Sequence, residues 1–92
     1  MDIFAQLADR IIREQESIIG PIALEQAGKV SGLHVNWQKH EIAFDGNKSN
    51  VIEKLVEQYK GLFGQASVEA CKDAVKALLP SMPKEQIPPL LR

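Results

Sequence analysis

Residues 9–20 read DRIIREQESIIG, and 44 positions later residues 53–64 read EKLVEQYKGLFG. In both stretches the apolar residues recur three and four positions apart, which is the spacing of one face of an α-helix, and a glycine ends the run. The matching pattern extends from residues 7–27 to residues 51–71. We therefore expect two amphipathic helix–Gly–helix hairpins, which an internal duplication would explain.

The evidence for duplication is a shared pattern more than shared residues. Only two aligned pairs are identical, the glycines at 20 and 64 and the glutamates at 25 and 69. Because any two amphipathic helical hairpins share such a pattern, common ancestry is a hypothesis. The physical requirement is the same either way: neither hairpin can bury its apolar stripe alone, so the two must pack on each other or on another copy.

Helices are expected at residues 3–19, from Pro21 to about Val30, at 49–63 and at 65–79. The side chains expected to face inward include the last apolar residues before each glycine and the first one after Pro21, namely Ile18, Ile19, Ile22, Leu62 and Phe63.

Residues 33–45 alternate apolar and polar side chains with a period of two, which predicts a β-hairpin. Pairing Leu33 with Phe44 and Val35 with Ile42 places all four on one face. The connection is either a two-residue turn at Gln38-Lys39 or a wider loop that includes Trp37 and His40.

The chain is expected to form one α+β, mainly helical domain over residues 1–92, because 92 residues provide a single core. Its order is ααββαα plus a C-terminal strap. The parts are a first helical hairpin, a β-hairpin, a second helical hairpin and a proline-rich tail, at residues 1–32, 33–45, 47–79 and 80–92. Within the tail, residues 84–87 could form one turn, and Pro88-Pro89 predicts an extended run to the end.

Composition limits the classes of function. Apolar residues make up 45% and charged residues 25%, which is typical of a folded globular protein. The net charge of −1 gives no basic footprint for a nucleic acid, so a DNA-binding regulator is the least favoured of three functions. The single cysteine cannot form an internal disulfide, no stretch resembles a signal peptide, and no apolar run is long enough to cross a membrane. We expect a cytoplasmic protein.

No arrangement of residues predicts catalysis, a metal or a cofactor. Cys71 lies on an inward stripe, where burial should raise its pKa and make it structural. His34 and His40 lack a third ligand near them in the sequence. Residues 45–56 resemble a calcium-binding loop only in part, because Asn50 and Val56 stand where glycine and glutamate are needed.

We therefore expect a small non-enzymatic module for protein interaction or regulation, acting as a homodimer or with another protein. A small-molecule sensor or carrier, with an apolar pocket between the helical hairpins, is the alternative. Trp37 is either an interface anchor or a lid over the helices, and the tail is either a strap or a free segment for a partner groove. The candidate interface residues are Trp37, His40, Val35, Ile42, Leu90 and Leu91.

Overall fold

A computed structural model describes all 92 residues. It confirms the mainly helical α+β architecture and the ααββαα order. The elements are α1 (Ile3–Ile19), α2 (Ile22–Ala27), β1 (Leu33–Asn36), β2 (Glu41–Phe44), α3 (Lys48–Phe63), α4 (Gln65–Val75) and three 3₁₀ turns, η1 (Leu79–Ser81), η2 (Lys84–Gln86) and η3 (Pro89–Leu91).

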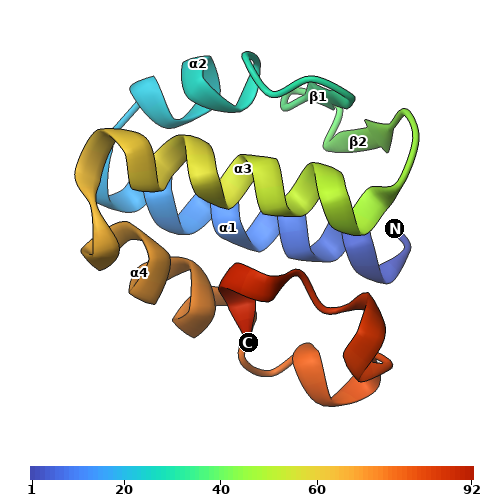
Figure 1. The fold of residues 1–92 in the computed structure, drawn as a ribbon. Coiled ribbons are helices and arrows are strands. Elements are labelled where there is room, and N and C mark those ends of the chain that lie inside the picture. Colours follow the sequence, from blue (N-terminus) through green and yellow to red (C-terminus); the bar gives the residue numbers. More distant parts are fainter.

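The long helices α1 and α3 form the middle of the molecule and run in the same direction (Figure 1). Figure 1 shows α2 and the β-hairpin on one side of this pair, and α4 and the tail on the other. The core lies between these layers, and most of its fully buried large side chains belong to α1 and α3. Both helix-to-helix turns therefore lie at the same end of the molecule.

The two long helices begin and end in equivalent ways. The side chains of Asp2 and Asn47 each accept a hydrogen bond from the amide three residues later, at 2.8 and 2.9 Å. Gly20 and Gly64 have φ of 75° and 76°, in the left-handed region that favours glycine. Their amides donate to the carbonyl four residues earlier, at 2.8 and 2.7 Å. The two turns therefore have the same backbone conformation.

The two helical hairpins also exchange equivalent hydrogen bonds. Gln15 on α1 donates from Nε2 to the carbonyl of Ser67 on α4 at 3.2 Å, and Tyr59 on α3 donates from its hydroxyl to the carbonyl of Ala23 on α2 at 2.7 Å. The two donors, Gln15 and Tyr59, are 44 positions apart in the sequence, and so are the two acceptors, Ala23 and Ser67. The two hairpins are therefore related by an approximate two-fold axis along α1 and α3, while their common ancestry stays a prediction.

The β-hairpin has the predicted register, with Leu33 opposite Phe44 and Val35 opposite Ile42. Its connection is the wider of the two alternatives, spanning residues 37–40, and the amide of His40 donates to the carbonyl of Trp37 at 3.2 Å. His40 has φ of 58°, which is unusual for a residue other than glycine.

Two predicted helix ends and one predicted backbone conformation were wrong. Helix α2 ends at Ala27 and not near Val30, because the amides of Lys29 and Val30 bond to carbonyls three residues back and tighten the chain into turns. Helix α4 ends at Val75 and not at residue 79, because the amides of Lys76 and Leu78 bond to carbonyls three residues back. The segment after Pro88 forms η3 and is not extended, because proline fixes φ at a value that a 3₁₀ turn accepts.

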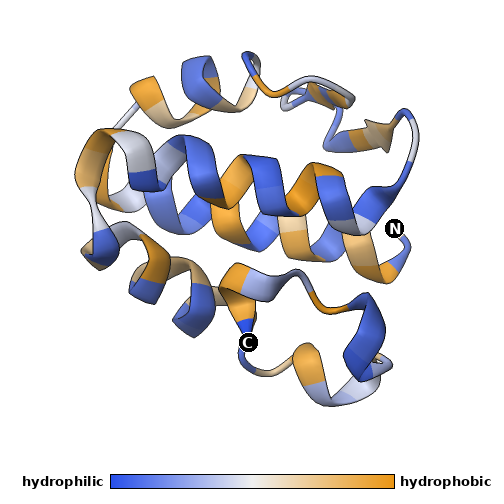
Figure 2. Cartoon of the chain, viewed as in Figure 1, coloured by the Kyte–Doolittle hydropathy of each residue, from blue (hydrophilic) through white to orange (hydrophobic).

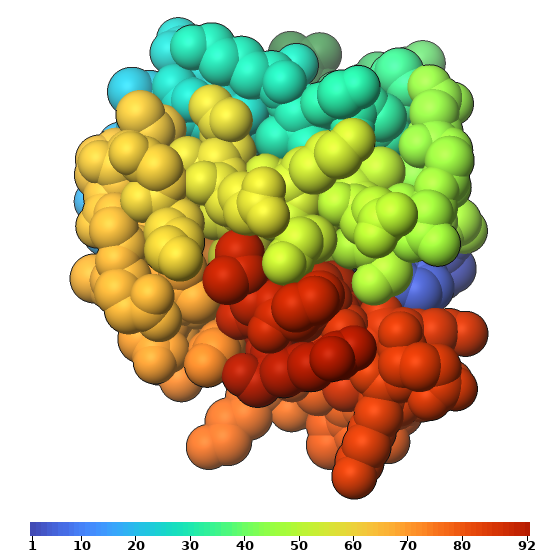
Figure 3. Space-filling view, in the orientation of Figure 1, coloured from blue at the N-terminus to red at the C-terminus, as the bar shows by residue number.

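The tail packs as a strap across α3 and α4, as the red segment of Figure 3 shows. The carboxylate of Glu53 accepts the amide of Leu90 at 2.9 Å, and the hydroxyl of Ser49 donates to the carbonyl of Gln86 at 2.8 Å. Leu91 is 2% exposed. The end of the chain is thus part of the core.

Candidate functional site

Four large apolar side chains remain exposed at the end where the two helix-to-helix turns meet. They were predicted to face inward, and this was wrong: Ile18 is 59%, Ile22 39%, Leu62 48% and Phe63 44% exposed. The helical spacing of α1 and α3 continues to these residues, but no facing element extends far enough to cover them. Figure 2 shows the hydrophobic colour at the start of α2 and at the end of α3. We call these four residues the turn face.

A hollow of about 160 Å³ opens within this end of the molecule. Two of its lining residues, Ile18 and Phe63, belong to the turn face and come from different helical hairpins. The full lining is Gln15, Ile18, Ile19, Phe63, Ala66 and Ser67. Residues next to both turns thus line the hollow, and its walls are mainly apolar.

Gln15 provides the polar group of the hollow. It is 1% exposed. Its Nε2 donates hydrogen bonds to the carbonyl of Ser67 and, at 3.4 Å, to the sulfur of Cys71. Since those two partners accept, the amide orientation is fixed and Oε1 is the free end. Oε1 has no hydrogen-bond partner, and because no fully buried side-chain nitrogen or oxygen lacks one, Oε1 keeps a small contact with solvent. Gln15 is one of the residues that line the hollow.

The hollow is lined by Gln15, which stands where the other helical hairpin has a tyrosine. Tyr59 is the equivalent residue 44 positions later, it is 0% exposed, and it lines none of the surface hollows. Its ring fills the space next to Ala23 that the shorter glutamine leaves open next to Ser67. Sequence reasoning missed Gln15, although a polar residue on an apolar stripe opposite an aromatic one was a usable signal.

Burial raises the pKa of two side chains in the core, Cys71 and Tyr59. Desolvation raises the pKa of Cys71 to about 11, although the hydrogen bond from Gln15 opposes this in part. Desolvation also raises the pKa of Tyr59. Both groups stay protonated at neutral pH, and for Cys71 this confirms the predicted direction. A buried thiol of this kind is a poor nucleophile.

The β-hairpin tip forms a second cluster of polar side chains against α1. The guanidinium of Arg13 donates to the imidazole of His40 at 2.8 Å and to the carboxylate of Asp9 at 3.1 Å, and lies 5.9 Å from the centre of the Trp37 ring. Asp9 and His40 are 3.3 Å apart. These contacts compensate the unfavourable φ of His40 and fix the tip in place. The predicted Trp37 and His40 do come together, whereas Asp9 and Arg13 were missed.

The other predicted interface residues are used largely inside the molecule. Val35 and Ile42 are partly buried on the hairpin face that packs on the core, and Trp37 is also partly buried against the core. In the tail, Leu90 is partly buried and Leu91 is buried, and both pack against the core. None of these residues lies on the turn face.

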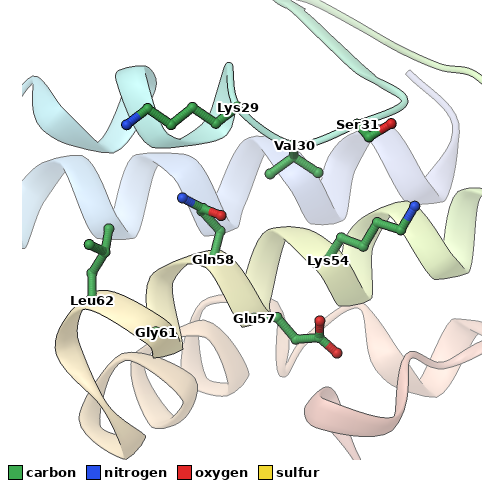
Figure 4. A pocket seen from close by; sticks show the side chains of 8 residues that line it. All are labelled: Lys29, Val30, Ser31, Lys54, Glu57, Gln58, Gly61 and Leu62. Atoms are coloured by element: carbon green, nitrogen blue, oxygen red, sulfur yellow. The ribbon is translucent and has the colours of Figure 1, made fainter.

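A third surface, a polar groove of about 460 Å³, lies between the end of α2 and α3 (Figure 4). Figure 4 shows the ammonium groups of Lys29 and Lys54 pointing toward opposite ends of the groove and the carboxylate of Glu57 pointing away from it. The amide Nε2 of Gln58 is already bonded to Gln26 at 2.7 Å. The charged groups of the groove do not point toward one place where a ligand could bind. This groove is therefore a weaker candidate for a binding site than the turn face.

No three His, Cys, Asp or Glu side chains lie close enough together to hold a metal ion. None of the helices combines the length and the apolar composition needed to cross a bilayer. Comparisons with models of protein families, with curated proteins and with solved structures give no match.

Proposed function

We propose that this protein is a non-enzymatic, cytoplasmic module that binds another protein through the turn face. The observation that carries the proposal is the cluster of four exposed, large apolar side chains at the ends of helices that meet at the two turns. At these fractions they expose roughly 350 Å² of apolar surface, which is the size of the largest apolar patch on a typical monomeric protein, and such a patch is often functional. Isolated exposed apolar residues would need no such explanation.

The area also bears on the kind of assembly. A stable protein interface buries about 800 Å² on each partner, so the turn face supplies less than half of what a homodimer would need. Self-association through this face alone would be weak. A partner that covers the face and extends over the neighbouring helices is therefore favoured over a second copy.

A small-molecule carrier is the second candidate, because the hollow lies between the two helical hairpins where a ligand site was expected. Sites for drug-sized ligands usually have about 300–1,000 Å³, roughly two or more times the size of this hollow. The hollow's 160 Å³ fits one side chain better than a whole metabolite. This comparison supports protein binding.

The proposal is tested by placing charges on the turn face. A variant with Ile18→Lys and Leu62→Lys is compared with a control that carries two lysines elsewhere, at the exposed positions Ala43 and Gln86. Each protein is used to capture partners, and any captured protein is purified and titrated by calorimetry. We expect the control to retain its affinity for the captured protein. The affinity of the turn-face variant should be lower by at least about 100-fold. Equal binding by both variants would remove the turn face as the site.

Sedimentation equilibrium of the wild type, the turn-face variant and the control tests self-association. We expect a monomer at micromolar concentration for all three. A wild-type dimer that only the turn-face variant disrupts would make the second copy the partner.

A further inference from the structure

We propose that the hollow is a receptor for one tyrosine side chain of a partner protein, with Gln15 Oε1 accepting the hydrogen bond from its phenolic hydroxyl. This inference rests on the proposed function and names the chemistry of the partner. It is carried by the size of the hollow, by the free acceptor, and by the tyrosine that fills the equivalent space in the other helical hairpin.

The size of the hollow matches one aromatic ring. Its 160 Å³ compares with the roughly 150 Å³ of an apolar protein cavity that takes up benzene. Ile18, Ile19 and Phe63 provide the apolar walls that a ring needs. An aromatic side chain that enters such a pocket is the usual anchor of a protein interface.

The free acceptor in the hollow, Gln15 Oε1, favours a partner side chain that carries a hydrogen-bond donor. A partner side chain without a donor would exclude water from Oε1 and leave this acceptor unsatisfied, which is costly for a nearly buried group. Tyr59 illustrates the arrangement, since its ring is enclosed while its hydroxyl donates to a carbonyl at 2.7 Å. A tyrosine from outside would repeat this on the other side of the approximate two-fold axis.

The partner must be another protein and not a second copy of this chain. The chain has one tyrosine and one tryptophan. Tyr59 is fully buried, and Trp37 is packed against the core beneath Arg13. Neither can enter the hollow of another molecule without leaving its own place in the fold.

The first test uses small probes with the shape of the side chain. Uniformly ¹⁵N-labelled protein is titrated with p-cresol, the tyrosine side chain itself, and separately with p-xylene, which has the same shape but no hydroxyl. We expect p-cresol to shift the side-chain amide of Gln15 and the backbone amides around the hollow, with a Kd of about 1 mM. p-Xylene should bind about tenfold more weakly, because it provides no donor. The absence of a saturable shift at these amides, or equal affinity for both probes, would overturn the proposal.

Variants that fill the hollow provide the second test. In Gln15→Tyr, the new ring should occupy the hollow and its hydroxyl should replace Nε2 as the donor to Ser67, as at Tyr59. We expect a folded protein that no longer binds p-cresol. Ala66→Leu fills the hollow from α4 and keeps Gln15, so it decides the question if Gln15→Tyr does not fold. Ala43→Leu, which adds the same bulk on the distant β2, should bind p-cresol like the wild type.

The partner from the capture experiment separates this inference from the proposed function. If Gln15→Tyr and Ala66→Leu bind that partner at least about 30-fold more weakly and Ala43→Leu does not, a partner side chain enters the hollow. Replacing the partner's tyrosines one at a time by phenylalanine should then identify a single site with a loss of about tenfold. If the lysine variant of the turn face loses the partner but the hollow-filling variants keep it, the interaction face stands and the tyrosine receptor is wrong.

Discussion

Removing the hydroxyl of Tyr59 tests how much the exchanged hydrogen bonds contribute to stability. In Tyr59→Phe the ring remains and only the bond to the carbonyl of Ala23 is lost. Both residues are 0% exposed, so water cannot readily replace the missing donor. The Ala23 carbonyl is in α2 and can keep its helical bond, which places the cost in the lower part of the range for a buried unpaired group.

The expected loss is about 1.5 kcal/mol in the free energy of unfolding at 25 °C. For a domain of this size, that corresponds to a decrease in Tm of roughly 6–12 °C. The measurement is urea unfolding followed by circular dichroism, with thermal melts of the same samples. Phe63→Tyr is the matched control, because it adds a hydroxyl at a ring that is 44% exposed and should change stability by less than about 0.5 kcal/mol. A loss below about 0.5 kcal/mol for Tyr59→Phe would refute the view that this bond helps join the two hairpins.

Three further predictions concern the glycines, the cysteine and the tail. Gly61→Ala, inside α3 with open space at the added Cβ, should stabilise the protein by about 0.5–1 kcal/mol. Gly64→Ala should destabilise it by about 1 kcal/mol, because Gly64 has a positive φ. Thermal melts measure both changes, and a change of the same sign in the two variants would contradict the argument. Because the folded protein raises the pKa of Cys71 from 9.0 to about 11, the stabilising effect of the neutral thiol is complete below pH 9 and is lost between pH 9 and 11. Wild type should therefore lose about 2–3 kcal/mol relative to Cys71→Ala over that window, measured by urea unfolding at each pH, and parallel profiles would show that the thiolate is tolerated. Deleting residues 88–92, which include the buried Leu91, should cost about 2–4 kcal/mol in chemical unfolding, and an unchanged midpoint would mean that the strap is dispensable.

Periodicity and turn residues were enough to predict the order of elements and the hairpin register. The spacing of apolar residues is imposed by helix and strand geometry, so Val35 and Ile42 could be paired from the sequence alone. Burial at the helix ends could not be predicted in this way. Ile18 and Leu62 continue the helical stripe, and only the lengths and placement of the packed neighbours determine that nothing covers them.

The candidate site was missed for a related reason. Gln15 is a polar residue in an apolar pattern, and its role depends on a carbonyl 52 positions away in the sequence. The cluster around Arg13 likewise depends on how the hairpin tip packs against α1. Such contacts between distant segments are set by tertiary packing, so propensity and spacing indicate where a helix lies but not what its polar side chains touch.

The reciprocal bonds between the two hairpins have a consequence for folding kinetics. Each helical hairpin is local and can begin to form within microseconds. However, Gln15 and Tyr59 find their acceptors only when the other hairpin has docked, at sequence separations of 52 and 36 residues. A half-folded chain would therefore expose an apolar stripe and also leave one of these donors without its acceptor. We expect single-exponential refolding with no populated intermediate, and amide hydrogen exchange that protects α1 and α3 with the same free energy because they open together.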